Sequence, residues 1–239
     1  MNKKLLLVLP LLMLMLLITA CGGRDTVVAT VNGEEILESE LDASVDQMVS
    51  SAKQQYAQFG MDLDMESEEG QMMLVQIKTQ ALENLIQQEV LMQAAEEAGY
   101  TVSDEELDTE IGGIKAQFTT EEEFEEALEA NGFTPESYRK RLKAELMISE
   151  FFQAQIETKE VSEEEIEAYY NDYVEQLEEH NEDAEEEEIR EIREFDDIKD
   201  DIEEQLIQED RQAQIGELIE TLMAKADIEH LIDFEEDNE

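Results

Sequence analysis

The chain has 239 residues, of which 65 are acidic and 16 are basic, for a formal net charge of −49. This charge excludes nucleic-acid binding, because phosphate recognition rests on clustered Lys and Arg side chains. One cysteine excludes an intrachain disulfide framework, and two histidines cannot supply a His-rich metal site. At 41% hydrophobic residues, the chain can still build a core of ordinary domain size.

The first 20 residues have the pattern of a secretion signal. Lys3 and Lys4 precede an apolar run over residues 5–17, and small residues then stand before Cys21. This order resembles the lipobox of bacterial lipoproteins. The resemblance implies that residues 1–20 are removed and that Cys21 carries a diacylglyceryl anchor and palmitate. Residues 21–26 would then tether the protein to the outer face of the cell membrane. The alternative is a plain secretion signal or an uncleaved membrane anchor.

The excess of acidic residues indicates a salty habitat and says little about what the protein binds or catalyses. At about 1 M salt the Debye length falls to roughly 3 Å, which screens the repulsion among carboxylates. A pI of about 4.1 is therefore typical of a halophile-like secreted protein. The acidic run at residues 182–188 lacks the spaced oxygen ligands and turn glycine of a calcium loop, which favours a solvated helix face or a linker.

Residues 27–36 predict the first folded element, a β-hairpin. Asn32 and Gly33 separate two β-prone runs, and both central positions of a type I′ turn need positive φ. Residues 226–232 alternate apolar and polar side chains, which predicts a strand that completes a small sheet with the hairpin. We expect a mostly α fold of long helices with a small sheet joining both ends of the chain, followed by a disordered acidic tail at residues 235–239.

Start and stop signals predict helices through the rest of the chain. Expected starts are a Ser39 cap, capping boxes at Ser103, Thr120 and Ser162, and Pro135 at the first position of a helix. The first two expected helices cover residues 39–59 and 66–98. A third follows Ser103 and is bent or weakened by the glycines at 112 and 113, and a short fourth helix ends before residue 132. The last three cover residues 135–158, a segment after Ser162, and a segment that begins at 195. The apolar stripe expected for the helix at 135–158 comprises Tyr138, Leu142, Leu146, Ser149, Phe152 and Ile156.

Several segments, in order, resemble the N-terminal chaperone domain of SurA and the matching domain of the PrsA foldase lipoproteins. They are residues 28–36 (VATVNGEEI), 82–91 (LENLIQQEVL), 99–106 (GYTVSDEE), 124–142, 161–170 (VSEEEIEAYY) and 198–228. The resemblance implies that residues 27–234 form one chaperone domain. In PrsA-like proteins a parvulin isomerase domain precedes the final helix. Here only the acidic residues 171–194 occupy that place, and they are too few for a parvulin sheet and its crossover helix.

No residue pattern predicts catalysis, a cofactor or a metal site, because the cysteine is assigned to lipid and neither histidine lies in a catalytic motif. We expect a membrane-tethered, extracytoplasmic chaperone that holds unfolded or partly folded secreted proteins in an apolar groove. Methionine suits such adaptable contacts, although each candidate could equally fill the core. The candidate client-binding residues are Phe59, Met61, Leu63, Met65, Met72, Met73, Tyr169, Tyr170 and Tyr173. The alternatives are a PrsA-like peptidyl-prolyl isomerase and an accessory lipoprotein with one dedicated partner.

Overall fold

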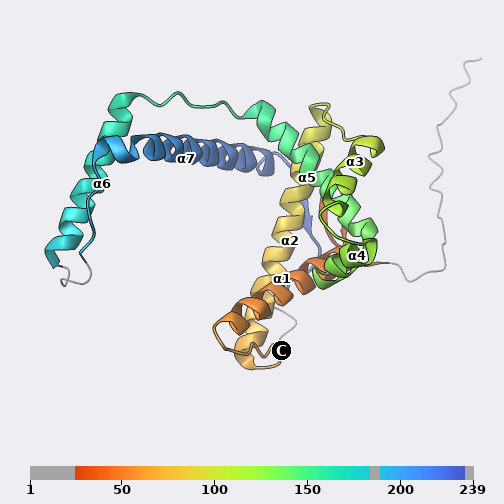
Figure 1. Cartoon of the computed structure of the whole chain (residues 1–239). Helices are drawn as coiled ribbons and strands as arrows, with labels where there is room; N and C mark the ends of the chain where they lie inside the picture. Colours follow the sequence, from red (N-terminus) through yellow and green to blue (C-terminus); the bar gives the residue numbers. More distant parts are fainter. Residues whose placement is uncertain (1–24, 184–188, 235–239) are drawn as a thin grey trace, which may run out of the picture.

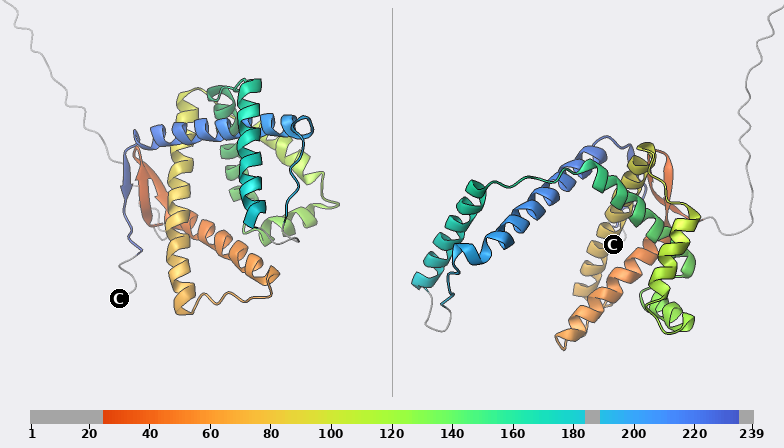
Figure 2. Two further views of the ribbon diagram at one scale, coloured as in Figure 1. Left: turned by 90° about the vertical axis from the view of Figure 1, so that its left-hand side faces the viewer. Right: turned by 45° about the horizontal axis from the view of Figure 1, so that its top comes forward.

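A computed structural model describes residues 25–183 and 189–234 of the chain. It consists of a head and an arm (Figure 1). The head holds a small sheet, five helices and the end of the last helix. The arm is formed by the sixth helix and the first half of the last one, which runs from the far end of the arm back to the head (Figures 1 and 2). This division decides which candidate residues can act together.

The predicted hairpin and third strand are confirmed. Strand β1 (Val27–Val31) pairs with β2 (Glu34–Leu37) and, on its other side, with β3 (Ile228–His230), all antiparallel in the order β2-β1-β3. The turn between β1 and β2 contains Asn32 at φ 53° and Gly33 at φ 92°. Both angles are positive, as the type I′ turn requires. The two ends of the folded chain therefore share one sheet.

The Asn32 turn also joins the sheet to the last helix and to the second one. The Asn32 amide donates to the Asp227 carbonyl at 2.7 Å, and the Asp227 amide donates back to the Asn32 side-chain oxygen at 2.8 Å. The Gln93 side chain donates to the Val31 carbonyl at 3.0 Å. These bonds satisfy backbone groups at the sheet's end, and they fix the C-terminal strand beside β1.

Seven helices account for most of the remaining described residues, which confirms the mostly α fold. Side chains at the predicted cap positions Ser103, Thr120 and Ser162, and that of Thr134 before Pro135, accept hydrogen bonds from amides of the following turn. The helices are α1 (Glu38–Gln58), α2 (Glu68–Glu97), α3 (Asp104–Lys115), α4 (Glu121–Ala130), α5 (Pro135–Gln155), α6 (Glu163–Asp183) and α7 (Phe195–Met223).

One local expectation about a helix start was wrong. The N-cap of helix α1 is Leu37, two residues before the predicted cap Ser39, and the Ser39 hydroxyl and amide both donate to the Asp25 carboxylate instead. A carboxylate from outside the helix thus accepts from its first turn. Helix α3 includes Gly112 and Gly113 and continues to Lys115.

The predicted apolar stripe of α5 was also displaced. The buried side chains of this helix are Ala144, Met147 and Phe151, whereas Ser149 is exposed and the predicted aromatic and leucine positions are half-buried at most. Helix α5 packs against both α2 and α3. A helix packed between two neighbours buries the side chains that face both of them, and its larger side chains then cover the edges of that contact. Periodicity alone could not locate the buried side chains.

Three separate apolar clusters hold the molecule together. The largest joins the sheet to α1 and α2 and includes the fully buried Val28, Val31 and Ile86. A second joins the end of α2 to α3, α5 and the end of α7 around Met147. The third lies in the arm, where Ile166, Ile198 and Ile202 are the buried side chains among the described residues. Most of the hydrophobic stabilisation therefore belongs to the head.

Candidate functional site

The candidate residues near the end of α1 surround a loop, residues 59–67, that leads into α2. Helices α1 and α2 diverge from their crossing, and this loop spans their far ends (Figure 2). We call residues 59–72, which are the loop and the start of α2, the tip. Phe59 is 71% exposed, Met61 is 52% exposed and Met72, in the first turns of α2, is 60% exposed. Exposed apolar side chains indicate an interaction surface where they form one patch, whereas single ones are ordinary.

The backbone of the tip is held in one conformation by close packing on Gly70. A β-carbon at Gly70 would lie 2.0 Å from the Asp64 carbonyl oxygen and 2.6 Å from the Met65 α-carbon, so only glycine fits there. The Ser67 hydroxyl accepts a hydrogen bond from the Gly70 amide at 3.0 Å and donates to the Asp64 carbonyl at 2.7 Å. The exposed side chains thus project from a structured loop.

The predicted methionine and aromatic set divides into exposed and packed members. Leu63 is only 9% exposed, so it anchors the loop and is not accessible to a client. Met65 and Met73 are half-buried and pack against the main core cluster. The accessible part of the predicted site at the tip is therefore Phe59, Met61 and Met72.

The three candidate tyrosines lie in the arm and not at the tip. Tyr169, Tyr170 and Tyr173 are half-buried against the arm cluster. The Tyr170 hydroxyl donates to the Arg193 carbonyl at 2.9 Å, and its ring meets Phe195 edge-on at 5.2 Å between centroids. The geometry gives these rings a packing role between α6 and α7. They do not extend the apolar surface of the tip.

The acidic residues 171–194 are more ordered than a loose linker through much of their length. Helix α6 continues to Asp183. The Asn181 side chain then forms two hydrogen bonds with the backbone of Arg190. It accepts from the Arg190 amide and donates to the Arg190 carbonyl, each at 2.8 Å. The segment that the sequence assigned to the position of an isomerase insert therefore includes most of α6, which packs against α7.

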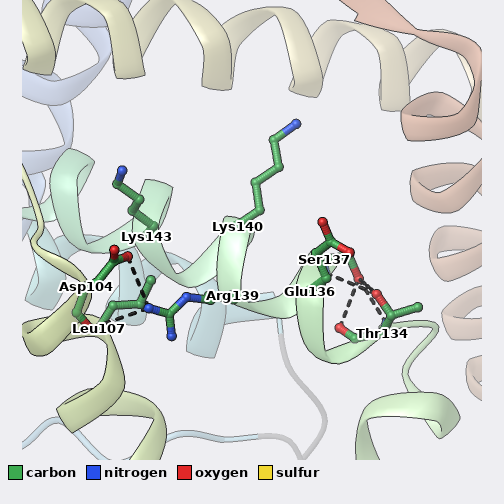
Figure 3. Close-up of a pocket in the computed structure, with 8 residues that line it drawn as sticks. All are labelled: Asp104, Leu107, Thr134, Glu136, Ser137, Arg139, Lys140 and Lys143. Atoms are coloured by element: carbon green, nitrogen blue, oxygen red, sulfur yellow. Dashed lines mark hydrogen bonds and ion pairs between the residues drawn. The ribbon is translucent and has the colours of Figure 1, made fainter. Parts of the chain in front are cut away.

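A pocket of about 550 Å³ lies between α3 and α5, and sequence reasoning missed it (Figure 3). It is lined by Asp104, Leu107, Thr134, Glu136, Ser137, Arg139, Lys140 and Lys143. Its signal in the sequence was the run of basic residues at 139–143 in an otherwise acidic chain.

Ion pairs between helices explain most of this basic run. Arg139 pairs with Asp104 and Asp108 of α3, and Lys140 pairs with Glu40 of α1. Figure 3 shows Arg139 turned towards Asp104, while Lys140 and Lys143 extend to the same side of α5. Hydrogen bonds to the two aspartates raise the pKa of Arg139. The pocket is thus an open gap where α5 is joined electrostatically to its neighbours.

Two further sequence predictions concern the membrane and metals. Cys21, the predicted lipid attachment site, lies outside the described residues. Within residues 25–183 and 189–234, no helix is long and apolar enough to cross a membrane. The same described ranges contain no group of three or more His, Cys, Asp or Glu side chains placed to hold a metal ion.

Known proteins match the chain in both sequence and fold. The model of the SurA-like N-terminal domain matches residues 3–152. Foldase protein PrsA of Clostridium botulinum strain Okra is 35% identical over 185 residues, and that of strain Hall is 34% identical over the same length. Each alignment covers 71% of this chain and 54% of the relative, so the chain spans about half the length of the curated relatives it matches.

A solved structure from a study of two SurA-like chaperones of Campylobacter jejuni has the same fold. It superimposes with a TM-score of 0.54 and 15% sequence identity, over 87% of this chain and 100% of that one. At this identity the likeness speaks for the fold, while the family is carried by the sequence match. The chain is a member of the SurA-like N-terminal domain family.

Proposed function

We propose that this protein is an extracytoplasmic chaperone that binds unfolded or partly folded secreted proteins through the exposed apolar side chains of its tip. Among the described residues, five large apolar side chains are strongly exposed, and Phe59, Met61 and Met72 are three of them. The observation that carries the proposal is that all three lie within residues 59–72, at the tip. Likeness to PrsA foldases and to SurA-like chaperones supports the same class of function.

The tip is suited to weak, interchangeable binding. Methionine is unbranched and polarizable, so Met61 and Met72 can adapt to different apolar side chains, while Phe59 adds a large flat surface. The loop beneath them is fixed by Leu63 and Gly70, which means that little backbone entropy is lost on binding. A rigid platform with flexible side chains suits many clients better than one dedicated partner.

The proposal includes a tether at the membrane. A lipid on Cys21 would leave only residues 22–24 between the anchor and the first described residue, Asp25. An extended chain spans at most about 3.6 Å per residue, so the head would stay within roughly 15 Å of its anchor. Such a short tether would keep the chaperone at the membrane face where secreted chains emerge. Lipid labelling of wild type and of Cys21→Ser tests this part independently.

Suppression of aggregation tests the chaperone function. The secreted form, residues 22–239, is mixed with several chemically unfolded secreted proteins at about 1 M salt, where charge repulsion is screened. We expect suppression at near-stoichiometric ratios, and we expect it to fall when Phe59, Met61 and Met72 are all replaced by Ser. The matched control replaces Ile189 and Leu231, which are 56% exposed each and lie elsewhere, by Ser.

Three outcomes would contradict the proposal or redirect it. Equal loss in the control would show that apolar exposure in general, and not the tip, binds clients. No suppression of any client by well-folded protein would favour an accessory lipoprotein with one dedicated partner. Isomerisation of a proline peptide above the uncatalysed rate would favour the PrsA-like isomerase instead.

A further inference from the structure

The apolar side chains of the tip stand among carboxylates that have no cationic neighbour in the sequence. Residues 54–77 contain five acidic side chains and no Lys, Arg or His. All five acids, which lie at positions 62, 64, 66, 68 and 69, are exposed. Within the described parts of the chain, none of the five forms a salt bridge, whereas the basic run of α5 is paired with acids of α1 and α3.

Some of these carboxylates have an ordinary structural role and some do not. Glu68 and Glu69 stand in the first turn of α2, where negative charge favours the helix dipole. Asp64 accepts a hydrogen bond from the Glu66 amide at 2.9 Å and so shapes the loop. The side chains of Asp62 and Glu66 lie outside the helix, and within the described parts of the chain neither carboxylate forms a hydrogen bond or salt bridge. They place negative charge beside Met61 and beside the start of α2.

We infer that the tip selects client segments in which a short apolar stretch is flanked by Lys or Arg side chains. This inference rests on the proposed function, since it names the class of segment that the tip would hold. Phe59, Met61 and Met72 would contact the apolar stretch, and Asp62 and Glu66 would attract the flanking cations. Charge complementarity of this kind adds specificity and speeds association, and it weakens as salt screens it.

Three peptides that share one apolar core test the inference against the whole secreted form of the chain. Their flanks carry either Lys, Gln or Glu, and binding is measured by fluorescence anisotropy at about 0.1 M and about 1 M salt. We expect the Lys-flanked peptide to bind most tightly and the Glu-flanked one most weakly at the lower salt. We expect the three affinities to converge at the higher salt.

Paired variants separate local attraction from the attraction of the whole acidic protein. The test variant carries Asp62→Asn and Glu66→Gln, and the control carries Glu125→Gln and Glu126→Gln, two exposed α4 positions away from the tip. Removing two charges that act at about 8 Å should lower the preference for Lys over Gln flanks about twofold in the test variant at the lower salt concentration. The control should keep that preference.

An unchanged preference in the test variant, or an equal fall in the control, would overturn the inference. The Gln-flanked peptide distinguishes this failure from failure of the proposed function. If that peptide binds wild type and loses binding in Phe59→Ser with Met61→Ser, the apolar site stands and only the charge selection fails. If no peptide binds at either salt concentration, both the proposed function and the inference fall.

Discussion

The head and the arm are built from similar helices but are stabilised by different means. Of the 24 buried hydrophobic residues among those described, only Ile166, Ile198 and Ile202 belong to the arm. The head joins the sheet and the helices α1, α2, α3 and α5 through two larger clusters. With so little buried apolar surface, the arm depends on polar connections, and regions of that kind open locally at low free-energy cost. The comparison therefore predicts two levels of stability in one chain.

Replacement of one buried isoleucine by Ala in each region should destabilise the head and the arm separately. Ile86→Ala removes a fully buried side chain from the head and should lower the free energy of unfolding by about 2–5 kcal/mol. Ile202→Ala deletes the same atoms in the arm, where the loss of hydrogen-exchange protection should be confined to α6 and the start of α7. Urea denaturation and residue-resolved hydrogen exchange measure both. If Ile202→Ala destabilised the head as much as Ile86→Ala does, the two regions would be one cooperative unit.

Within the head, two glycines offer a sharper comparison. Gly70→Ala drives a β-carbon into the Asp64 carbonyl and should cost about 1–3 kcal/mol, because backbone must move. Gly113→Ala meets no atom within 4 Å inside α3 and should stabilise the protein by about 0.4–1 kcal/mol. Thermal and urea unfolding should therefore shift in opposite directions. A tolerated Gly70→Ala would mean that the tip is a loose loop and not a fixed platform.

The sequence could predict the elements of both regions because their signals are local. The turn at Asn32 and Gly33, the cap at Thr134 before Pro135, and the capping box at Ser103 each depend on neighbouring residues. It was harder to predict from the sequence which face of each helix is buried. The buried line of α5 through Ala144 depends on two neighbouring helices that no periodicity within α5 reveals.

The candidate site shows the same limit. A cluster of methionines between residues 59 and 73 was visible in the sequence, but their burial was not. Met73 turns towards the core and Met72 towards solvent, because adjacent helical positions differ by about 100°. The tyrosines of α6 were assigned to a groove, but they pack within the arm because α7 returns alongside them. Contacts between distant segments decide both cases.

The connection from α5 to the arm provides a smaller, polar test of the comparison. The Gln214 side chain accepts from the Glu157 amide at 3.1 Å and donates to the Glu157 carbonyl at 2.9 Å. Gln214→Ala should cost about 1 kcal/mol and raise hydrogen exchange at residues 157–162, with the head unchanged. Gln208→Ala, at an exposed position of the same helix, is the control. Equal exchange in both variants would remove Gln214 as the link between head and arm.

The smallest effect compares two similar helix starts, one in each region. Glu106 of α3 and Glu165 of α6 both bond the serine that caps their helix. In the head, hydrogen bonds from Ser103 alone lower the pKa of Glu106. In the arm, Lys159 at 2.8 Å adds to the bonds from Ser162 and lowers the pKa of Glu165 to about 2. The arm thus uses an ion pair where the head needs none.

Titration of these two carboxyls by nuclear magnetic resonance tests that difference. A lowered pKa means that the contribution of Glu165 to the start of α6 is complete above its unfolded value of 4.5 and is lost as the pH falls through about 2. In Lys159→Gln the pKa of Glu165 should move up towards its ordinary value, while that of Glu106 stays in place. About 1 M salt should have the same selective effect, because screening weakens the exposed ion pair more than a short hydrogen bond to serine. If the pKa of Glu165 stayed in place in Lys159→Gln, serine capping alone would set the pKa in both regions, and the arm would share the head's means of starting a helix.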